Sequence, residues 1–593
     1  MLETVRKLHA LINKDDQIKV YALVILMIVT AIVQTIGIAS IMPFLNVLSN
    51  PGAIEETPWI SAVYETLQFA SPQSFLYTLG IIAFIIFVTG TALQAITFWA
   101  IVRFTHMQQY ELSRRLMKDY LRRPYSFFLS RNSSDLAKTV LHETGQAISG
   151  ALLPAMRLLS QIMLAGFVLA FIIAINPWIS ILAASIIGVI YLTIYLTARK
   201  WLNKIGRDRV DANKERYTAT AEAFTGAKEI RLLGREDNYL ERYRQPAKRL
   251  AKHEANSSLL NDTPQYAIEA FTFGGVLILV TLLITVEGGI ENAIPIIGVY
   301  ALAARQLIPA FHKIFSTFTA MRFNLPAVDN VLEDLESDTP KTLPLSNTNE
   351  SRLRPKHTIR LTDISFRYPD SKGFALDQLS LSIKANTTIG IIGHSGSGKS
   401  TLADIMLGLL TPGNGSVFID DTKLTDAASR QWQKSIGYVP QTIFLADQSI
   451  KENIALGIPE NEIDMASVIH ASKLAELHDF VTSELPSGYN TIIGERGVRL
   501  SGGQRQRIGI ARALYNNPDV LFFDEATSAL DNATEKLVMR SIKKLSGTKT
   551  IILIAHRLST VRSCDEIIVI DKGKILTKGT WDEISASHPA ALA

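Results

Sequence analysis

Long uncharged segments in the first half of the chain restrict what it can fold into. No charged residue lies between Val20 and Ile54, and this run exceeds the ~20 apolar residues that a helix needs to cross a bilayer. A second uncharged run covers the 41 residues from Leu158 to Ala198 and is interrupted only by NPW at 176–178. That length fits two spanning helices joined by a tight turn. The first half is therefore predicted to be a helical membrane domain.

Six spans are predicted within this domain, which we place at residues 1–335. Their approximate bounds are 20–48, 75–104, 157–176, 178–199, 265–286 and 292–313. The sixth span has the weakest signal, because Arg305 interrupts its apolar sequence. A cleaved signal peptide is a poor alternative for the first span, since the apolar run is too long and no small-residue cleavage site ends it.

Lysine and arginine are distributed unevenly between the predicted loops. Nine lie between Arg103 and Arg157 and fifteen between Arg199 and Pro264, whereas the segments 49–74 and 286–292 contain none. By the positive-inside rule, the two basic segments and both termini are expected in the cytoplasm.

Both basic segments are rich in helix formers, which predicts that the spanning helices continue into the cytoplasm. We expect them to turn through short cross-helices near RRPYSFFLSRN (122–132) and GAKEIRLLGRED (226–237). The alternative is a pair of ordinary basic loops that bind lipid headgroups.

The second half of the chain has a different character. Residues 336–357 are polar and contain proline, which is typical of a linker. From residue 358 to residue 593, short β-rich runs alternate with helical stretches, which predicts an α/β domain with a buried, largely parallel sheet. The single cysteine, Cys564, excludes an internal disulfide and is expected to be a small buried apolar residue.

A glycine-rich phosphate-binding loop follows the apolar run TIGII in this second domain. Its sequence GHSGSGKST occupies 393–401, with a strand pattern before it and a helix pattern after it. Backbone N–H groups of such a loop surround phosphate oxygens, a lysine reaches the β- and γ-phosphates, and a hydroxyl ligates Mg²⁺. The residues predicted to bind ATP are Gly393, Ser395, Gly396, Ser397, Gly398, Lys399, Ser400 and Thr401, with Ser400 also a ligand of Mg²⁺.

Polar residues at the ends of other apolar runs complete the predicted catalytic set. VLFFDE ends in Asp524, a candidate ligand of Mg²⁺, and Glu525, a candidate general base for the attacking water. His556 ends TIILIAH and could contact the γ-phosphate, while Gln441 could sense the metal or the water. Tyr368 offers a ring for adenine. An acidic pair usually caps a helix and a lone histidine is usually structural, so these roles depend on the nearby phosphate loop.

A second glycine loop, LSGGQ at 500–504, begins another helix pattern about a hundred residues after the first. One ATP does not need two phosphate-binding loops from a single chain. The simplest solution is that this loop binds the γ-phosphate of a nucleotide held by another copy of the domain, so that ATP joins two copies and hydrolysis separates them. The residues predicted to act in this way are Ser501, Gly502, Gly503 and Gln504.

Together these motifs resemble ATP-binding cassette exporters of the half-transporter type, over nearly the whole chain. The resemblance implies a membrane all-α six-helix domain of the type IV exporter fold, followed by an α/β P-loop nucleotide-binding domain. It identifies SALD at 528–531 as a D-loop and GERG at 494–497 as the loop that contacts membrane-domain helices. It also implies ATP and Mg²⁺ as cofactors, cross-helices that dock on the cassettes, and a homodimer, because each catalytic position is intact.

Within that family the chain looks most like bacterial flippases of lipid-linked oligosaccharides. One supporting feature is TPWISAVYETLQF at 57–69, whose apolar residues recur at helical spacing and predict an amphipathic helix on the outer face. Another is Arg305. Insertion of a charged side chain at the centre of a membrane costs ~2.5–3.5 kcal/mol, so this arginine is expected to face a water-filled cavity. There it could contact a diphosphate group. The alternative is a snorkelling or helix-end arginine. These flippases are expected to carry several such arginines, and the uncharged cores of the other spans supply none.

The expected function is therefore ATP-driven export or flipping of an amphipathic, lipid-linked substrate across a bacterial inner membrane, with both termini and the nucleotide-binding domain in the cytoplasm. Export of peptides or hydrophobic small molecules is the alternative. A channel or receptor gated by ATP is less well supported, because a pure gate has no need of Glu525. A soluble DNA-repair ATPase does not fit the six spans, and no nucleic-acid partner is expected.

Overall fold

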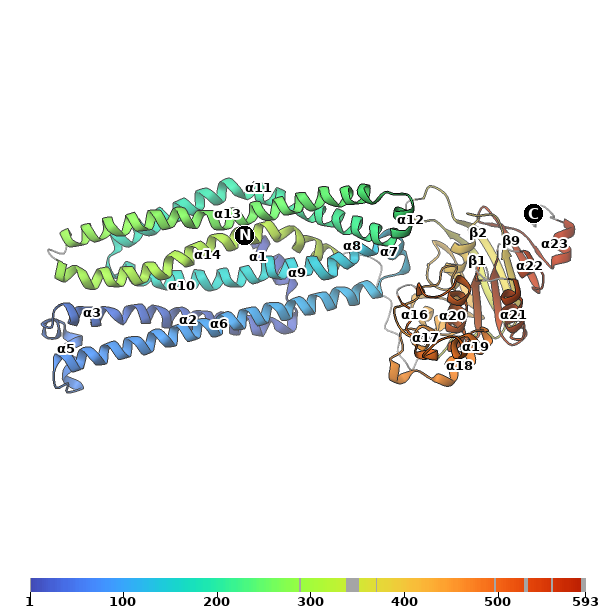
Figure 1. Ribbon diagram of the computed structural model, residues 1–593, viewed down its shortest axis with the longest axis horizontal. Helices are drawn as coiled ribbons and strands as arrows, with labels where there is room; N and C mark the ends of the chain where they lie inside the picture. Colours follow the sequence, from blue (N-terminus) through green and yellow to red (C-terminus); the bar gives the residue numbers. More distant parts are fainter. Residues whose placement is uncertain are drawn as a thin grey trace. The chain divides into compact units, whose positions relative to one another are not determined.

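The computed structural model describes residues 2–286, 290–336, 351–369, 371–494, 497–526, 532–555 and 558–587 (Figure 1). The chain divides into two compact units. The first comprises residues 1–121 and 131–339, and the second comprises residues 122–130 and 340–593. The short segment 122–130 therefore belongs with the C-terminal unit, although it lies within the N-terminal half of the sequence.

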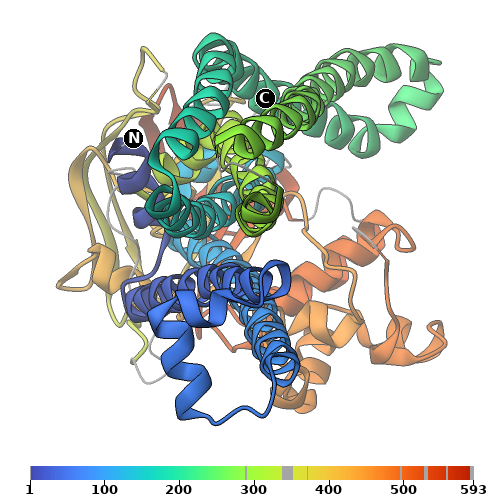
Figure 2. The same cartoon turned by 90° about the vertical axis from the view of Figure 1, so that its left-hand side faces the viewer.

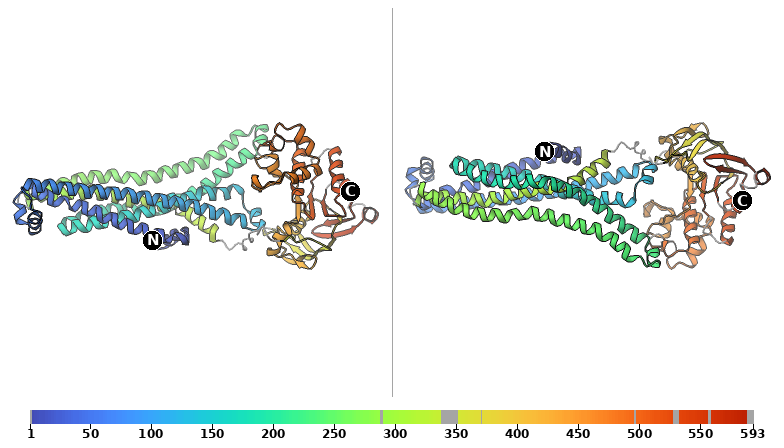
Figure 3. Two further views of the ribbon diagram at one scale, coloured as in Figure 1. Left: turned by 90° about the horizontal axis from the view of Figure 1, so that it is seen from below. Right: turned by 90° about the horizontal axis from the view of Figure 1, so that it is seen from above.

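The first unit consists of long helices that run side by side (Figures 1 and 3). Figure 2 shows them nearly end-on, with α11 next to α13. Their bounds are α1 (Leu2–Leu11), α2 (Gln17–Ala39), α3 (Ile41–Ser49), α6 (Pro72–Arg122), α10 (Leu153–Ile175), α11 (Pro177–Thr225), α13 (Glu236–Val286) and α14 (Ile290–Glu336). The first predicted span is divided between α2 and α3, where Pro43 in the first turn of α3 lacks the N–H that would continue the helix.

Four helical segments among the described residues are long and apolar enough to cross a membrane. They are Gln17–Ser49, Pro72–Arg122, Ser133–Ile175 and Ile294–Glu336. These segments contain the first and second predicted spans and all but one or two residues of the third and sixth, while α11 and α13 contain the fourth and fifth. The count of six spans remains a prediction.

The short cross-helices predicted from the basic segments are confirmed as α7 (Tyr125–Ser130) and α12 (Ala227–Leu232). Just after α7, the chain forms α8 (Ser133–Lys138), a π-helical turn at Thr139–Glu143, α9 (Thr144–Ala147) and a second π-helical turn at Ile148–Leu152. The two basic segments are thus helical, as predicted, and the alternative of ordinary basic loops is wrong.

The predicted outer helix forms as α5 (Pro58–Thr66), after the short α4 (Ala53–Glu56). The apolar face of α5 is divided between two environments. Ile60 is buried and packs with Val47 and Phe75 of neighbouring helices, whereas Trp59 is 56% exposed. Because part of the apolar face packs against the protein, only the remainder is available to a lipid surface.

The second unit contains two sheets. The first is antiparallel, in the order β2-β1-β4-β5, with bounds β1 (Thr358–Phe366), β2 (Leu376–Lys384), β4 (Asn414–Ile419) and β5 (Thr422–Lys423). The second has the order β10-β9-β3-β8-β7-β6 and is parallel except for β10, with bounds β3 (Thr388–Ile392), β6 (Ile436–Val439), β7 (Val520–Asp524), β8 (Thr550–Ile554), β9 (Glu566–Asp571) and β10 (Lys574–Gly579).

Apolar cores lie on both faces of the six-stranded sheet, and β3, β7 and β8 are continuous apolar runs, as expected for strands buried on both faces. β8 is buried at every position, and Cys564 is buried in the same core. The helices described between residues 399 and 587 are α15 (Lys399–Met406), α16 (Asp426–Gln433), α17 (Ile450–Ile454), α18 (Met465–Leu474), α19 (His478–Ser483), α20 (Gly502–Tyr515), α21 (Asn532–Lys543), α22 (Leu558–Val561) and α23 (Trp581–Ser587).

Candidate nucleotide-binding site

The phosphate loop joins the end of β3 to the first residue of α15. Gly393, Gly396 and Gly398 all have positive φ angles, of 154°, 78° and 105°. A Cβ on Gly398 would lie 2.6 Å from the carbonyl oxygen of Ala375, so a larger residue fits neither the backbone angle nor the space. Positive φ angles of this kind allow a loop to turn successive N–H groups toward one anion.

Two buried side chains of the loop fit a phosphate-bound metal complex. Lys399 is 6% exposed, and its Nζ donates hydrogen bonds of 2.8 Å to the carbonyls of Gly393 and His394. Burial lowers the pKa of Lys399, although Glu525 and Asp524 act against this shift. Ser397 is 4% exposed, and its Oγ has no hydrogen-bond partner among the described residues.

A buried hydroxyl without a partner costs free energy unless a ligand satisfies it. The loop therefore fits an anion, and ATP with Mg²⁺ supplies one. Ser400 is the second residue of α15, and its hydroxyl is the predicted ligand of Mg²⁺ together with Asp524 at the end of β7. A bound Mg²⁺ would neutralise phosphate charge at this position.

Glu525 follows β7 in a strained backbone conformation. Its φ angle is 51°, a region that costs a non-glycine residue about 1–3 kcal/mol and that is concentrated at active sites. Its Oε2 accepts a hydrogen bond of 2.7 Å from Nε2 of Gln441. Its backbone carbonyl accepts a long bond of 3.5 Å from Nε2 of Gln506 on α20. The structure thus brings together Glu525 and Gln441, which the sequence places 84 residues apart.

Two residues beside this site were not identified from the sequence. Asp404 lies on α15 among buried apolar residues, and burial raises its pKa to about 6, with a further contribution from Asp524. Tyr438 lies on β6, next to the strand that ends in Asp524. An acidic residue within an otherwise apolar helix could have drawn attention to Asp404, whereas Tyr438 carries no sequence signal.

The second glycine loop caps α20. Ser501 Oγ accepts a hydrogen bond from the N–H of Gln504, and Gln504 Oε1 accepts one from the N–H of Ser501, at 3.2 Å and 2.7 Å. This reciprocal capping fixes the loop at the N-terminus of a 14-residue helix, where the helix dipole favours an anion. Ser501 is exposed, and Gly502 and Gly503 follow it at the start of the helix.

The remaining predicted residues have different outcomes. Tyr368 donates to or accepts from Thr401 Oγ1 at 3.1 Å, and its ring meets Phe366 edge-on, so stacking on adenine stays a prediction. His556, the D-loop at 528–531, and Glu495 and Arg496 lie outside the described residues.

Arg305 lies well inside α14 and is exposed, so it is not at a helix end. Its guanidinium lies over the ring of Phe87 on α6, 6.0 Å from the centroid. The neighbouring residue, Gln306, donates a hydrogen bond to Gln34 of α2. Polar groups of α2 and α14 therefore meet beside this arginine.

Comparisons with known proteins agree with this geometry. A family model described as ABC transporter transmembrane region matches residues 18–303, and one described as ABC transporter matches residues 376–528. The chain is similar to the alpha-hemolysin translocation ATP-binding protein HlyB of Escherichia coli O6:H1, with 49% identity over 234 residues, 40% of this chain and 32% of that protein. It is similarly related to the leukotoxin translocation ATP-binding protein LktB of Mannheimia glucosida, with 50% identity over 226 residues, 38% of this chain and 32% of that protein.

The aligned part of this chain thus spans about a third of the length of the curated relatives it matches. The structure of a bacterial Atm1-family ABC exporter with ATP bound covers 97% of each chain, with a TM-score of 0.76 and 22% sequence identity, which establishes the fold. A transmembrane region and an ATP-binding cassette follow each other in one polypeptide, in the order of an exporter half-transporter. The chain belongs to the ABC transporter family.

Proposed function

We propose that the chain is an ATP-driven exporter that works as a pair of identical copies. The observation that carries this proposal is the contact between Glu525 and Gln441 beside the phosphate loop. A carboxylate held by an amide at the end of a strand is suited to accept a proton from water, and Lys399 and Ser400 are suited to hold the triphosphate and its Mg²⁺. A chain that only sensed ATP would not need this general base.

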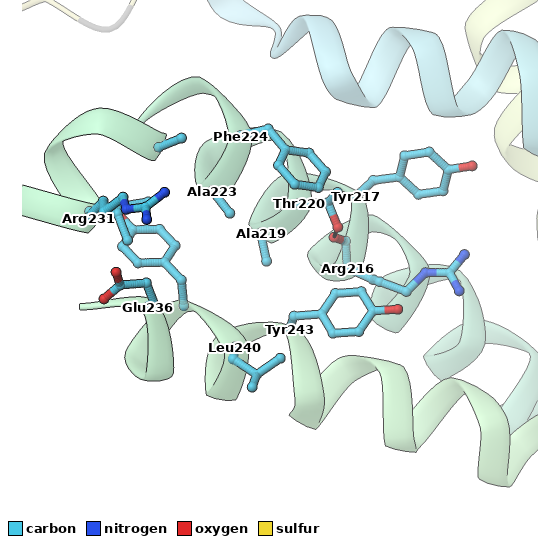
Figure 4. Close-up of a pocket in the computed structure, with 13 residues that line it drawn as sticks. Arg216, Tyr217, Ala219, Thr220, Ala223, Phe224, Arg231, Glu236, Leu240 and Tyr243 are labelled. Carbon is cyan, nitrogen blue, oxygen red and sulfur yellow. Dashed lines mark hydrogen bonds between the residues drawn. The ribbon is translucent and has the colours of Figure 1, made fainter. Parts of the chain in front are cut away.

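Two surfaces support the pairing of copies. Ser501 is exposed at the N-terminus of α20, available to a phosphate held by another chain. The tip of the α11–α12–α13 hairpin exposes apolar residues, with Phe224 79% exposed and Leu232 83% exposed. Beside them lies a pocket of about 860 Å³, into which Tyr243 and other side chains of α11 and α13 project (Figure 4). Large apolar side chains in water favour a partner surface, and we assign this one to the second copy.

Ser501→Arg tests the pairing. The substitution places a long cation where the second copy would present the γ-phosphate, so we expect loss of hydrolysis. Binding of ATP to the isolated polypeptide, measured by a fluorescent nucleotide analogue, should remain. Loss of that binding as well would mean that the loop serves its own nucleotide.

For the cargo, we propose a peptide or protein. The support is the similarity of 38–40% of this chain to ATP-binding proteins named for the translocation of hemolysin and leukotoxin. The aligned part covers 38–40% of the chain, so recognition of the cargo must be tested separately. Export of a lipid-linked glycan is the second candidate, and Arg305, with the polar contacts of Gln306 beside it, is the observation that favours it.

One comparison separates these candidates. Native host cells that carry the unchanged chain or the Glu525→Gln variant are compared by mass spectrometry. A peptide or protein that accumulates inside cells with the variant supports the first candidate. A lipid-linked glycan that accumulates instead overturns it and supports the second. Arg305→Ala then serves as the local test, because it should weaken stimulation of the ATPase by a phosphate-bearing cargo and leave basal hydrolysis unchanged.

A further inference from the structure

One face of α20 lies along the loop that follows Gln441. A Cβ on Gly509 would lie 2.4 Å from Cδ1 and 3.0 Å from Cγ1 of Ile443, so the helix and the loop are in close contact at this turn. Arg512 follows Gly509 by three residues, which places it on the same side of the helix. Two successive turns of α20 therefore face this loop.

The guanidinium of Arg512 donates hydrogen bonds to two backbone carbonyls. Its Nη1 donates to the carbonyl oxygen of Phe444, the third residue after Gln441, and its Nε donates to that of Asn453 on α17, each at 2.8 Å. A guanidinium is planar and presents its donors in fixed directions. The two bonds therefore hold the loop and α17 at set positions relative to α20.

Asn453 extends this contact to the rest of the loop. Residues 441–448, which all lie within the described part of the chain, form neither a helix nor a strand, so side chains must hold much of their backbone. The side chain of Asn453 is fully buried, and its Oδ1 accepts a hydrogen bond of 3.0 Å from the N–H of Ala446. Its Nδ2 donates to the carbonyls of Ala446 and Ser449, at 3.0 Å and 3.1 Å.

The loop begins at the amide that contacts the candidate general base. Gln441 donates its bond of 2.7 Å to the carboxylate of Glu525, and Gln506 of α20 donates its long bond to the backbone carbonyl of the same residue. Gln506, Gly509 and Arg512 are spaced three residues apart along α20. This side of the helix thus contacts both Glu525 and the loop that holds its partner.

We propose that Arg512 is a positioning residue, which fixes the loop after Gln441 to α20 and so keeps the Gln441 amide on Glu525. The proposal rests on the function proposed above for Glu525 and Gln441. It adds a consequence for the pair of copies, because α20 begins at the Ser501 loop that we predict to meet the nucleotide of the other copy. A displacement of that loop would reach Gln441 through a single helix.

Arg512→Lys tests the proposal in the purified full chain. The positive charge remains, but one amine cannot replace the two fixed donors of the guanidinium. We expect kcat for ATP hydrolysis to fall about tenfold, the effect of one hydrogen bond to a charged group. The KM for ATP should stay within about twofold, because Lys399 and the phosphate loop are unchanged. Hydrogen exchange of the peptide that covers residues 442–449 should become faster.

Arg507→Lys is the matched control on the same helix. Arg507 Nη1 donates a hydrogen bond of 2.6 Å to the carbonyl of Glu476, after α18, and we expect its substitution to leave kcat within about twofold. Both variants are assayed well below their midpoints of thermal unfolding. Unchanged kcat in Arg512→Lys, or an equal fall in the control, would overturn the proposal. If Arg512→Lys does not fold, Arg512→Gln takes its place, since its amide can still donate to one carbonyl.

The double variant Arg512→Lys/Gln441→Ala tests whether Arg512 acts through Gln441. Without the amide, the loop has nothing left to place on Glu525, so kcat should equal that of Gln441→Ala alone. Losses that multiply would mean that Arg512 acts elsewhere, and they would overturn the proposal. Near-normal turnover in Glu525→Gln would instead contradict the proposed function, so the two failures are distinguishable.

Discussion

Glu525→Gln offers the sharpest test of the proposed chemistry, because the structure predicts what the substitution leaves intact. In the unchanged chain, Glu525 Oε2 accepts a hydrogen bond of 2.7 Å from Gln441. A glutamine at this position has the same shape, and its carbonyl oxygen can accept the same bond. The contact of the backbone carbonyl with Gln506 and the positive φ angle also remain. The negative charge of the carboxylate is lost, and with it the ability to take up a proton.

The expected loss of ATPase activity follows from the removal of this general base. Removal of a positioned general base typically slows a reaction by about 10²–10⁴-fold, which corresponds to about 3–5 kcal/mol at 1.36 kcal/mol per factor of ten. ATP binding should stay within about twofold of the unchanged chain, since no group predicted to hold the nucleotide changes. We therefore expect a dimer that forms with ATP and does not separate.

The assay measures phosphate release at saturating ATP, together with size-exclusion chromatography after incubation with ATP and Mg²⁺. Gln441→Ala is the companion variant, because it removes the orienting amide and leaves the carboxylate, so its loss should be smaller. Turnover of Glu525→Gln within tenfold of the unchanged chain would refute the role of Glu525. A larger loss in Gln441→Ala than in Glu525→Gln would refute the reasoning about orientation.

Three further substitutions, the last with a matched control variant, test the fold. Asp420 accepts hydrogen bonds of 2.8 Å from three backbone N–H groups just before and at the start of β1. Burial by itself would raise the pKa of Asp420, but these hydrogen bonds hold the pKa below its usual value. Asp420→Asn should therefore cost about 1–3 kcal/mol at neutral pH, and the difference from the unchanged chain should shrink as the pH of chemical denaturation falls below about 4. Trp432 is fully buried and donates to a carbonyl of α15, so Trp432→Phe should cost about 2–4 kcal/mol in the same assay. Gly206→Ala would place a Cβ 2.5 Å from the carbonyl oxygen of Phe323, so it should lower the midpoint of thermal unfolding in detergent. Gly166→Ala is the control, because a Cβ there would meet no described atom within 4 Å, and it should leave the midpoint unchanged. Equal midpoints for the two variants would contradict the tight packing of α11 on α14.

The local parts of the nucleotide site were predictable from the sequence. Lys399 and Ser400 follow from the spacing of glycines in one loop, and the end of an apolar strand predicts the position of Asp524. The contact between Glu525 and Gln441 was not predictable, because it depends on two strands becoming neighbours in the sheet. A one-dimensional pattern contains no information on which strand lies next to which.

In the membrane unit, too, local features were predictable from the sequence and contacts between helices were not. The uncharged runs predict where long helices form, since helix length and hydropathy are local properties. They do not predict that Arg209 on α11 is 4% exposed and bonds Gln146 and Asn324 from two other helices, at 3.0 Å and 2.8 Å. From the sequence, a basic residue in a predicted cytoplasmic segment is expected to be exposed to solvent. Arg209 is buried only because three helices pack around it.

Helix α6 continues without a break for 51 residues. At a rise of 1.5 Å per residue its axis is about 75 Å long, more than twice the ~30 Å thickness of a hydrocarbon core. An unbroken helix of this length behaves as a lever arm, so a tilt of about 5° at one end displaces the other by about 6 Å. A rigid arm converts a small rotation into a movement of the size of a side chain, at a distance where no direct contact could act.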